Sequence, residues 1–418
     1  MPELSTDHSS ATLEGAHSHG GPRYVSSRAD RPTSFDPADI PVPRGREEEW
    51  RFTPMKRFAP LFDLDTIRTA TAASEADVAA GAIRVEADLP EGARLETVPR
   101  SDARIGTVGA PVDRTGITAW NGTETATVLT LESGAQLERA ARLNVVGQDP
   151  ELARPIAQHI LVAAESGAKG TVVLDHTGAA ALTQGVEVTV ADGAELTLVT
   201  VQGWEDDAVH ASNHRVKVTG RGVLKHVVVS LGGDVRICPD LGFSGEGGRI
   251  EAFGVYFTDA GQHQEHRPYV AHTEPHCYSR VAYKGALQGE GAHAVWVGDC
   301  LIGHAARGTD TYELNRNLVL TEGAKADSVP NLEIENGNIE GAGHASATGR
   351  FDDEQLFYLC ARGITEIEAR RLVVLGFFNE IVAEIGVPEV QERLMGAIEE
   401  ELELTGLVSA RAEAAERP

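Results

Sequence analysis

The stretch VEVTVADGAELTLVTV, residues 186–201, contains the pattern that decides the fold. Apolar residues alternate with polar ones over 186–190 and again over 196–201, which is the period of a half-buried β-strand. Between the two runs, Asp192-Gly193-Ala194 reads as a corner, because glycine adopts the positive φ that such a turn needs. The predicted unit is therefore strand, glycine corner and strand.

The same unit recurs imperfectly along the chain. Similar strand-like runs are found at 127–131, 171–174, 226–229 and 294–297, and corner phrases at 133–135, 166–168, 246–248, 290–292 and 322–324. A repeat of this kind predicts stacked coils, each of which buries its inner face only against its neighbours. An ordinary β-sandwich is the alternative, but the low aromatic content (5%) and abundant Val and Thr favour the narrow interior of a solenoid.

Composition limits the function classes that remain open. The chain has 418 residues and a formal net charge of −26, which argues against binding to nucleic acid or to an anionic membrane. No apolar run is long enough for a membrane span, and no secretory signal is recognisable, so a cytoplasmic location is expected. The four cysteines include no CxxC pair, which predicts free thiols rather than a disulfide scaffold.

The chain is expected to divide into five segments. These are a disordered tail at 1–35, a mixed and partly helical region at 36–115, the β-helix core at 116–349, a helical domain at 350–408 and a frayed tail at 409–418. The core is predicted to hold nearly all strands, so the protein is expected to be mainly β.

The C-terminal segment predicts two amphipathic helices. Thr365 and Glu368 form a capping box, and Leu375 and Phe378 then lie on one helix face. After Gly386, a second helix begins near Pro388 and places Leu394 and Ile398 on one face. These apolar faces need cover from the end of the solenoid or from a partner. We expect the four apolar residues to contribute to partner binding.

One cluster of ligand-type residues is a candidate metal site. Its members are His263, His266, His272, His276 and Cys277, with His293, Cys300 and His304 farther along the chain and Glu265 as a nearby carboxylate. Their spacings match no compact metal motif, and neighbouring residues of a strand point to opposite faces. The simpler interpretation is a set of hydrogen-bonded or solvated side chains along the coils. No nucleophile elbow, P-loop or zinc-protease motif is present either, so no residue is predicted to be catalytic.

The segment PNLEIENGNIEGAGHASATGRFDDEQLFYLCARG, residues 330–363, joins the β region to the helical one, with His344 at the centre of its small-residue part. This segment resembles the SufB/SufD family of iron–sulfur cluster assembly proteins. Its most specific pieces are HASATGR (344–350), DEQLFYL (353–359) and RGITE (362–366). The phrases REEEWRFTPM (46–55) and NRNL (315–318) are similar to the family as well, so that the resemblance covers about residues 40–405.

The resemblance implies a right-handed parallel β-helix with N-terminal and C-terminal helical parts. It also implies a complex with a SufC-like ABC-type ATPase, docked on the C-terminal helices, and with a SufB-like paralogue, paired through the β-helices. A homodimer is the assembly implied for the isolated chain. The iron–sulfur cluster would be transient and shared across the paralogue interface.

Among the two paralogues, the chain is more similar to SufD. SufB-type chains carry a cysteine near Ile334, whereas residues 333–336 here read EIEN, and the family histidine is retained as His344. The resemblance thus implies a non-enzymatic scaffold subunit in which His344 binds iron or a cluster together with a partner's cysteine, since histidine can replace a thiolate ligand. The alternatives are a SufB-like scaffold that itself carries the nascent cluster and, less well supported, a β-helix carbohydrate-active enzyme.

Overall fold

The computed structural model describes residues 28–69, 83–351, 353–400 and 402. The chain divides into two compact units, Met1–Arg31 and Pro32–Pro418. The described end of the first unit carries the short 3-10 helix η2 (Arg28–Asp30). The parts of the predicted tails at 1–27 and 403–418, and the Ala-rich stretch at 70–82, lie outside the described residues.

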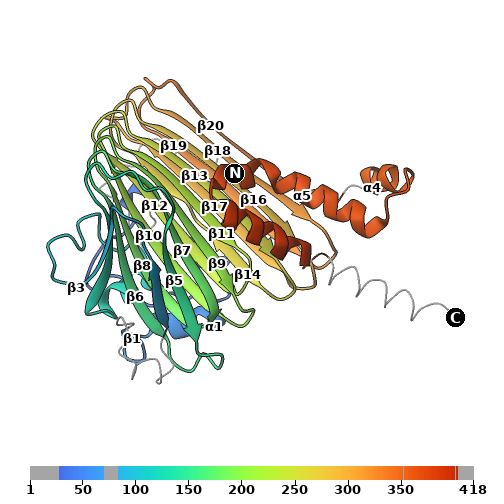
Figure 1. Ribbon diagram of the computed structural model, residues 1–418, viewed down its shortest axis with the longest axis horizontal. Coiled ribbons are helices and arrows are strands. Elements are labelled where there is room, and N and C mark those ends of the chain that lie inside the picture. The colour runs from blue at the N-terminus through green and yellow to red at the C-terminus, as the bar shows by residue number, and fades with distance from the viewer. Residues whose placement is uncertain (1–27, 70–82, 352, 401, 403–418) are drawn as a thin grey trace, which may run out of the picture. The chain divides into compact units, whose positions relative to one another are not determined.

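Two sheets make up most of the second unit, and most successive strands of the chain alternate between them (Figure 1). Sheet A has eleven strands, with the neighbours β14 (His263–His266), β17 (His293–Ile302), β15 (Tyr269–His272), β12 (Asp234–Ser244), β10 (Val209–Thr219), β8 (Ala181–Val190), β6 (Ile156–Ala164), β4 (Thr125–Leu131) and β3 (Ala93–Pro99), while β1 (Arg68–Thr69) joins β6 and β19 (Lys325–Ile334) joins β17. Sheet B has nine strands in the order β2 (Arg84–Asp88), β5 (Ala141–Gln148), β7 (Lys169–Ala179), β9 (Glu195–Trp204), β11 (Val223–Ser230), β13 (Arg249–Thr258), β16 (Tyr278–Leu287), β18 (Asp310–Val319) and β20 (Gly341–Arg350).

Neighbouring coils pair in parallel. Among the described strands, only β2–β5 and β3–β4 at the N-terminal end are antiparallel. Gly134, Gly167 and Gly193 lie at the predicted corners with φ of 72°. The structure therefore confirms a β-solenoid, and it excludes the β-sandwich, whose strands would be antiparallel.

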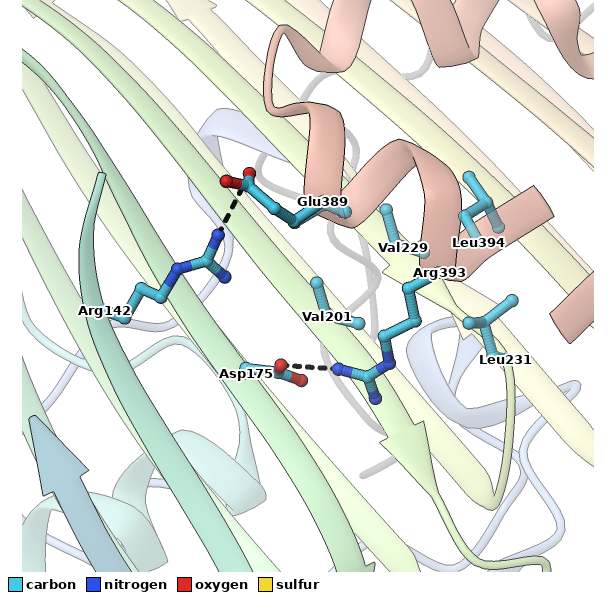
Figure 2. A pocket seen from close by; sticks show the side chains of 9 residues that line it. Arg142, Asp175, Val201, Val229, Leu231, Glu389, Arg393 and Leu394 are labelled. Carbon is cyan, nitrogen blue, oxygen red and sulfur yellow. Dashed lines mark hydrogen bonds and ion pairs between the residues drawn. The ribbon is translucent and has the colours of Figure 1, made fainter. Parts of the chain in front are cut away.

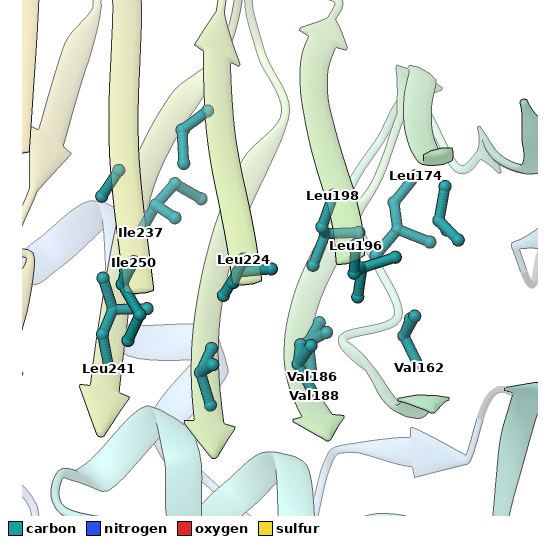
Figure 3. Close-up of a cluster of buried hydrophobic side chains, with 14 of the residues drawn as sticks. Val162, Leu174, Val186, Val188, Leu196, Leu198, Leu224, Ile237, Leu241 and Ile250 are labelled. Atoms are coloured by element: carbon teal, nitrogen blue, oxygen red, sulfur yellow. The ribbon is translucent and has the colours of Figure 1, made fainter. Parts of the chain in front are cut away.

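Aliphatic side chains stack in register between the two sheets. Val162, Val188, Val216 and Leu241 occupy equivalent positions on four neighbouring strands of sheet A. They meet residues of sheet B such as Leu198, and all of them are buried (Figure 3). Because every coil repeats this arrangement, the interior stays narrow and the coils support one another.

Two glycines of sheet B provide the space for two tyrosines. Gly254 lies opposite Tyr283 on the neighbouring strand, and Tyr256 lies opposite Gly285 in the same pair of strands. A Cβ added to Gly285 would lie 1.7 Å from Cε2 of Tyr256. The exchange of large and small side chains between β13 and β16 thus leaves no room for one more carbon.

We expect Gly285→Ala to lower the free energy of unfolding by about 1–3 kcal/mol or more, because the added methyl group must displace a buried ring. Gly349→Ala on β20 is the matched control, since a Cβ there meets open space. Urea unfolding of the two variants measures the difference. Equal stability of both would show that Tyr256 moves aside without cost.

Short helices of the N-terminal segment cover the outer face of sheet A. The helices η3 (Glu48–Trp50), α1 (Met55–Phe58) and η4 (Ala59–Phe62) bury Trp50, Phe58 and Phe62 against β8 and β10. Ser34 and Phe35, which fall in the predicted tail, belong to this cover: the Ser34 amide donates to the Pro111 carbonyl.

A longer helix, α3 (Arg114–Asn121), also contacts β6, β8 and β10. Asp113 caps it by accepting a hydrogen bond from the Gly116 amide at 2.8 Å. The sequence pattern predicted strands from residue 116; this is corrected, because residues 114–121 are helical and the next strand, β4, begins at Thr125. The cap and the burial of Ile117 outweigh the β propensity of the helix residues.

Of the described C-terminal helices, the second and third lie on the outer face of sheet B, whereas the first packs against the second. In chain order they are α4 (Asp353–Cys360), α5 (Glu366–Ile385) and a helix at 388–400. As predicted, Thr365 caps α5 by accepting from the Glu368 amide, and Gly386 ends it with φ of 68°. None of the described helices is long and apolar enough to cross a membrane.

Candidate functional site

His344 lies on β20, the last strand of sheet B. Its partner in register on β18 is Glu313, whose neighbour on β16 is the core residue Val281, so His344 continues a column that faces the interior. Among the described strands, no further strand pairs with the outer edge of β20, and the imidazole is exposed. His344 therefore occupies the open end of the solenoid interior.

The interior becomes polar in this last part of the solenoid. Asn315 and Asn317 of β18 bond to each other at 2.8 Å, and Asn315 accepts from Ser328 of β19 at 2.7 Å. The Ser346 hydroxyl of β20 donates to Ser328 at 2.7 Å. Hydrogen bonds thus join the final two coils alongside aliphatic packing, to which Ala326, Leu332 and Ala342 contribute. A surface of this kind remains compatible with water when no further coil covers it.

Glu313 is the unusual residue beneath His344. Its side chain is buried, and neither carboxylate oxygen has a hydrogen-bond partner among the described residues. Burial, with the nearby charge of Asp299, raises the pKa of Glu313 to about 8. At neutral pH the carboxyl group is therefore mostly protonated and can donate a hydrogen bond. Burial likewise raises the pKa of the Cys300 thiol to about 12, so this cysteine is not a thiolate.

We expect Glu313→Gln to stabilise the protein at alkaline pH. The folded-state pKa of Glu313 lies above its value in the unfolded chain, so the folded state retains the proton as pH rises from about 4.5 to 8. The native protein loses up to about 5 kcal/mol over this window, whereas a neutral amide loses nothing. Thermal unfolding of the native protein and the variant at pH 6 and pH 9 measures this difference in stability. A melting temperature of the variant that falls as steeply as that of the native protein would contradict the assignment.

Hydrogen-bonded polar side chains also run through the interior of earlier coils. Gln184 donates to Gln158 at 2.7 Å and accepts from Ser212 at 2.9 Å. His214 lies 2.9 Å from the Ser212 hydroxyl and 2.8 Å from His226. Burial lowers the pKa of both imidazoles, that of His226 to about 4, so they are neutral at pH 7. These side chains bond to one another and are held away from solvent, and only the Nδ1 atom of His226 among their fully buried polar atoms lacks a hydrogen-bond partner within the described residues.

The predicted ligand cluster does not converge. His272 points into the interior, where its Nε2 atom bonds Ser279 at 2.8 Å, whereas His263 lies on the outer face of sheet A. His276 and the buried Cys277 lie at a corner, and His304 is exposed on another turn. Among the described residues, no group of three or more His, Cys, Asp or Glu side chains could hold a metal ion. His263 and His272 lie on opposite faces of sheet A, and His276, Cys277 and His304 lie on turns rather than on strands.

The four residues expected to bind a partner are largely used within the chain. Phe378, Leu394 and Ile398 are buried against outward-facing residues of sheet B, and Leu375 is partly buried beside them. The sheet supplies the cover that these helix faces need. The side chains that the C-terminal helices expose are different ones: Phe357 (75% exposed), Tyr358 (55%) and Leu372 (46%).

A small crevice marks where the helix at 388–400 meets sheet B (Figure 2). Arg393 pairs with Asp175 at 2.5 Å, and Glu389 pairs with Arg142 at 3.3 Å. Its volume of about 30 Å³ has room for a water molecule rather than for a ligand. The two ion pairs therefore fasten the helix to the solenoid and do not form a binding site.

Sequence reasoning missed Glu313, although a signal for it exists. Along 311–318, polar Thr311, Glu313, Asn315 and Asn317 alternate with Tyr312 and three other residues. This alternation places these four polar residues on one face, and the register shows that the face is the inner one. The sequence alone does not tell which face of the strand is inside.

Comparison with known proteins agrees with this architecture. A family model described as "SUF system FeS cluster assembly, SufBD core domain" matches residues 145–377. An iron–sulfur cluster assembly SufBD family protein of Mycobacterium bovis is 49% identical over 379 residues, which is 89% of this chain and 92% of the relative. A protein of the same description from Mycobacterium leprae is 46% identical over 379 residues, or 89% of this chain and 93% of the relative.

A more distant relative covers less of the chain. The SufBD family protein of Staphylococcus saprophyticus is 28% identical over 201 residues, which is 48% of this chain and 43% of the relative. The family model and the mycobacterial relatives both span the strands that carry Glu313 and His344. The chain therefore belongs to the SufBD family of iron–sulfur cluster assembly proteins.

Proposed function

We propose that this chain is a SufD-type scaffold subunit of a cytoplasmic complex that assembles iron–sulfur clusters. It works without an enzymatic activity of its own, together with a SufB-like subunit and a SufC-like ABC-type ATPase. Membership of the family supports the role in assembly. The absence of a cysteine from β19 and from the turn at 335–336 supports the SufD type, because the chain then offers no thiolate beside His344.

One observation carries the proposal: the last coil is exposed and has His344 on its final strand. β17 is buried along nearly its whole length, whereas β19 is mostly half-buried and β20 is mostly exposed. An exposed edge strand presents a row of unpaired backbone groups that another strand can extend. A second solenoid that docks on this coil would cover both the polar interior and His344.

The chemistry at such an interface fits a shared cluster. Iron–sulfur clusters prefer thiolate ligands, and imidazole can replace one of them. His344 offers a ring nitrogen, and a SufB-like subunit would supply the cysteine. The nascent cluster is then cargo that both subunits hold until it is passed on. The protonated carboxyl group of Glu313, one strand inward, is in position to donate a hydrogen bond toward the interface.

The ATPase subunit is proposed to dock on the exposed side of the C-terminal helices. Phe357, Tyr358 and Leu372 are large apolar side chains that the chain itself leaves exposed. Exposed aromatic residues grouped on one short element are typical of protein interfaces. The buried faces of α5 and of the helix at 388–400 would then hold the docking elements on the solenoid without touching the partner.

We expect a Phe357→Asp, Tyr358→Asp double variant to lose the ATPase when the three subunits are co-expressed and purified through this chain. The SufB-like subunit should still co-purify, because the terminal coil is unchanged. The matched control is Val42→Asp, which changes an exposed apolar residue (50%) of the N-terminal segment. Unchanged recovery of the ATPase with the double variant would refute the docking site. Failure of the unmodified chain to recover either subunit would refute the proposed complex.

A further inference from the structure

Two histidines face each other on the outer face of sheet A, away from the site described above. His263 of β14 and His293 of β17 are direct partners in register on neighbouring strands. Their Nδ1 atoms are 3.2 Å apart, and the ring planes meet at 60°. The His263 side chain is 3% exposed and that of His293 is 24% exposed, so the pair is reached by solvent from one side.

Each ring has its other nitrogen against a carboxylate. The Nε2 atom of His263 lies 3.2 Å from Glu265, and the Nε2 atom of His293 lies 2.8 Å from Asp327. Glu265 also pairs with Arg236 and Arg267, and Asp327 pairs with Lys325 at 2.6 Å. Both carboxylates are therefore charged acceptors, and each Nε2 atom must donate to its carboxylate.

This arrangement leaves two lone pairs directed at the same space. A neutral imidazole that donates from Nε2 has its lone pair on Nδ1, and the two Nδ1 atoms are the ones that face each other. Two acceptors at 3.2 Å repel unless a cation lies between them. Two nitrogens bound at about 2.1 Å to one tetrahedral ion are about 3.4 Å apart, which is close to the distance found here.

We propose that His263 and His293 bind one divalent first-row transition metal ion through their Nδ1 atoms. Glu265 and Asp327 act as the carboxylates that fix the orientation of metal-bound histidines in many proteins. No third His, Cys, Asp or Glu of the described residues joins the pair, so water occupies the remaining positions on the exposed side of His293. Imidazole ligands suit zinc, iron, cobalt, nickel and copper.

The surroundings set the strength of the site. Lys325, Arg236 and Arg267 are nearby positive charges that oppose a metal ion. Their ion pairs with Asp327 and Glu265 reduce the field that they exert on it. The backbone amide of His263 donates to Asp234 at 2.8 Å, and the ring of Phe58 packs at 6.3 Å from the His263 ring. These contacts hold His263 in place before any ion binds. Metal binding therefore costs little conformational entropy at this side chain.

The experiment titrates the metal-free, full-length protein with Co²⁺ and records the visible absorption of the bound ion. The sequence has three further histidines, His8, His17 and His19, outside the described residues, and these are changed to alanine in every protein tested. We expect one Co²⁺ to bind and Zn²⁺ to displace it. His293→Gln should weaken binding at least about tenfold, and Asp327→Asn about 10–100-fold. The control His304→Gln, at an exposed histidine, should bind as the parent does.

Two results would overturn the proposal. One is Co²⁺ binding by His293→Gln equal to that of the parent, or no binding by the parent. The other is a nitrogen-15 spectrum in saturating Zn²⁺ that shows a protonated Nδ1 in His263 or His293, because the pair would then share a proton instead of a metal. Should His293→Gln fail to fold, Asp327→Asn decides the question, since it leaves both rings in place.

Discussion

Mild acid should destabilise this protein by several kcal/mol. Burial lowers the pKa of six imidazoles inside the solenoid, including His210 and His214. For four of them the pKa falls to about 4 (His176, His226 and His272) or to about 3 (His266). In the unfolded chain these groups bind a proton near pH 6.5. As pH falls below this value, the unfolded state binds protons that the folded state does not bind. The free energy of unfolding therefore decreases.

The size of the effect follows from the width of this window. Between about pH 7.5 and pH 5, each of the four groups lowers the free energy of unfolding by about 2 kcal/mol. Glu313 acts in the opposite direction over part of the window, because its folded-state pKa of about 8 favours the folded state as pH falls. The loss of stability should therefore be steeper in Glu313→Gln than in the native protein.

Urea unfolding at a series of pH values measures this behaviour. His176→Gln should reduce the pH-dependent decrease in the free energy of unfolding by the contribution of one histidine. Glutamine remains neutral over this range and keeps a hydrogen-bonding group in the interior. His304→Gln, at an exposed position, is the control and should leave the profile unchanged. A free energy of unfolding that stays constant from pH 7.5 to 5 would show that the imidazoles are hydrated or protonated in the folded state.

Local patterns predicted much of the fold. The alternation around Gly193 gave the strands and the corner, and the Thr365–Glu368 box marked the start of α5. These features depend on residues close in sequence, which is why they can be read without the structure. The strand pattern expected from residue 116 was wrong at its start, because the helix at Arg114–Asn121 depends on the Asp113 cap and on burial against sheet A.

Features that depend on the register between coils could not be predicted. Leu394 and Ile398 form an amphipathic face that was expected to bind a partner, whereas its cover is the distant sheet B. Glu313 lies under His344, and His263 lies opposite His293, because the coils have particular lengths. Coil length varies with each corner, so small uncertainties in the strand boundaries change which residues meet.

His344→Ala should abolish most cluster assembly while leaving the protein folded. The side chain is exposed on an edge strand, and loss of such a group changes stability by about 0.5 kcal/mol or less. As a cluster ligand it is required directly, so we expect assembly to fall at least about tenfold, the lower end of what removal of even a supporting residue costs at a metal site. Binding of the SufB-like subunit should persist, because backbone pairing does not need the imidazole.

The matched control is His304→Ala, which removes another exposed imidazole from a turn. It should assemble clusters as the native protein does, and it guards against a general effect of losing a surface histidine. Recovery of the complete complex with each variant shows whether a loss of assembly reflects the site or a failure to associate.

The most direct measurement is the activity of a cluster-dependent enzyme in cells whose only copy of this chain carries His344→Ala. The proposed role predicts a loss of at least about tenfold with the complex intact, and normal activity with His304→Ala. Full activity with His344→Ala in an intact complex would contradict the account, because the terminal coil would then be an interface without a ligand.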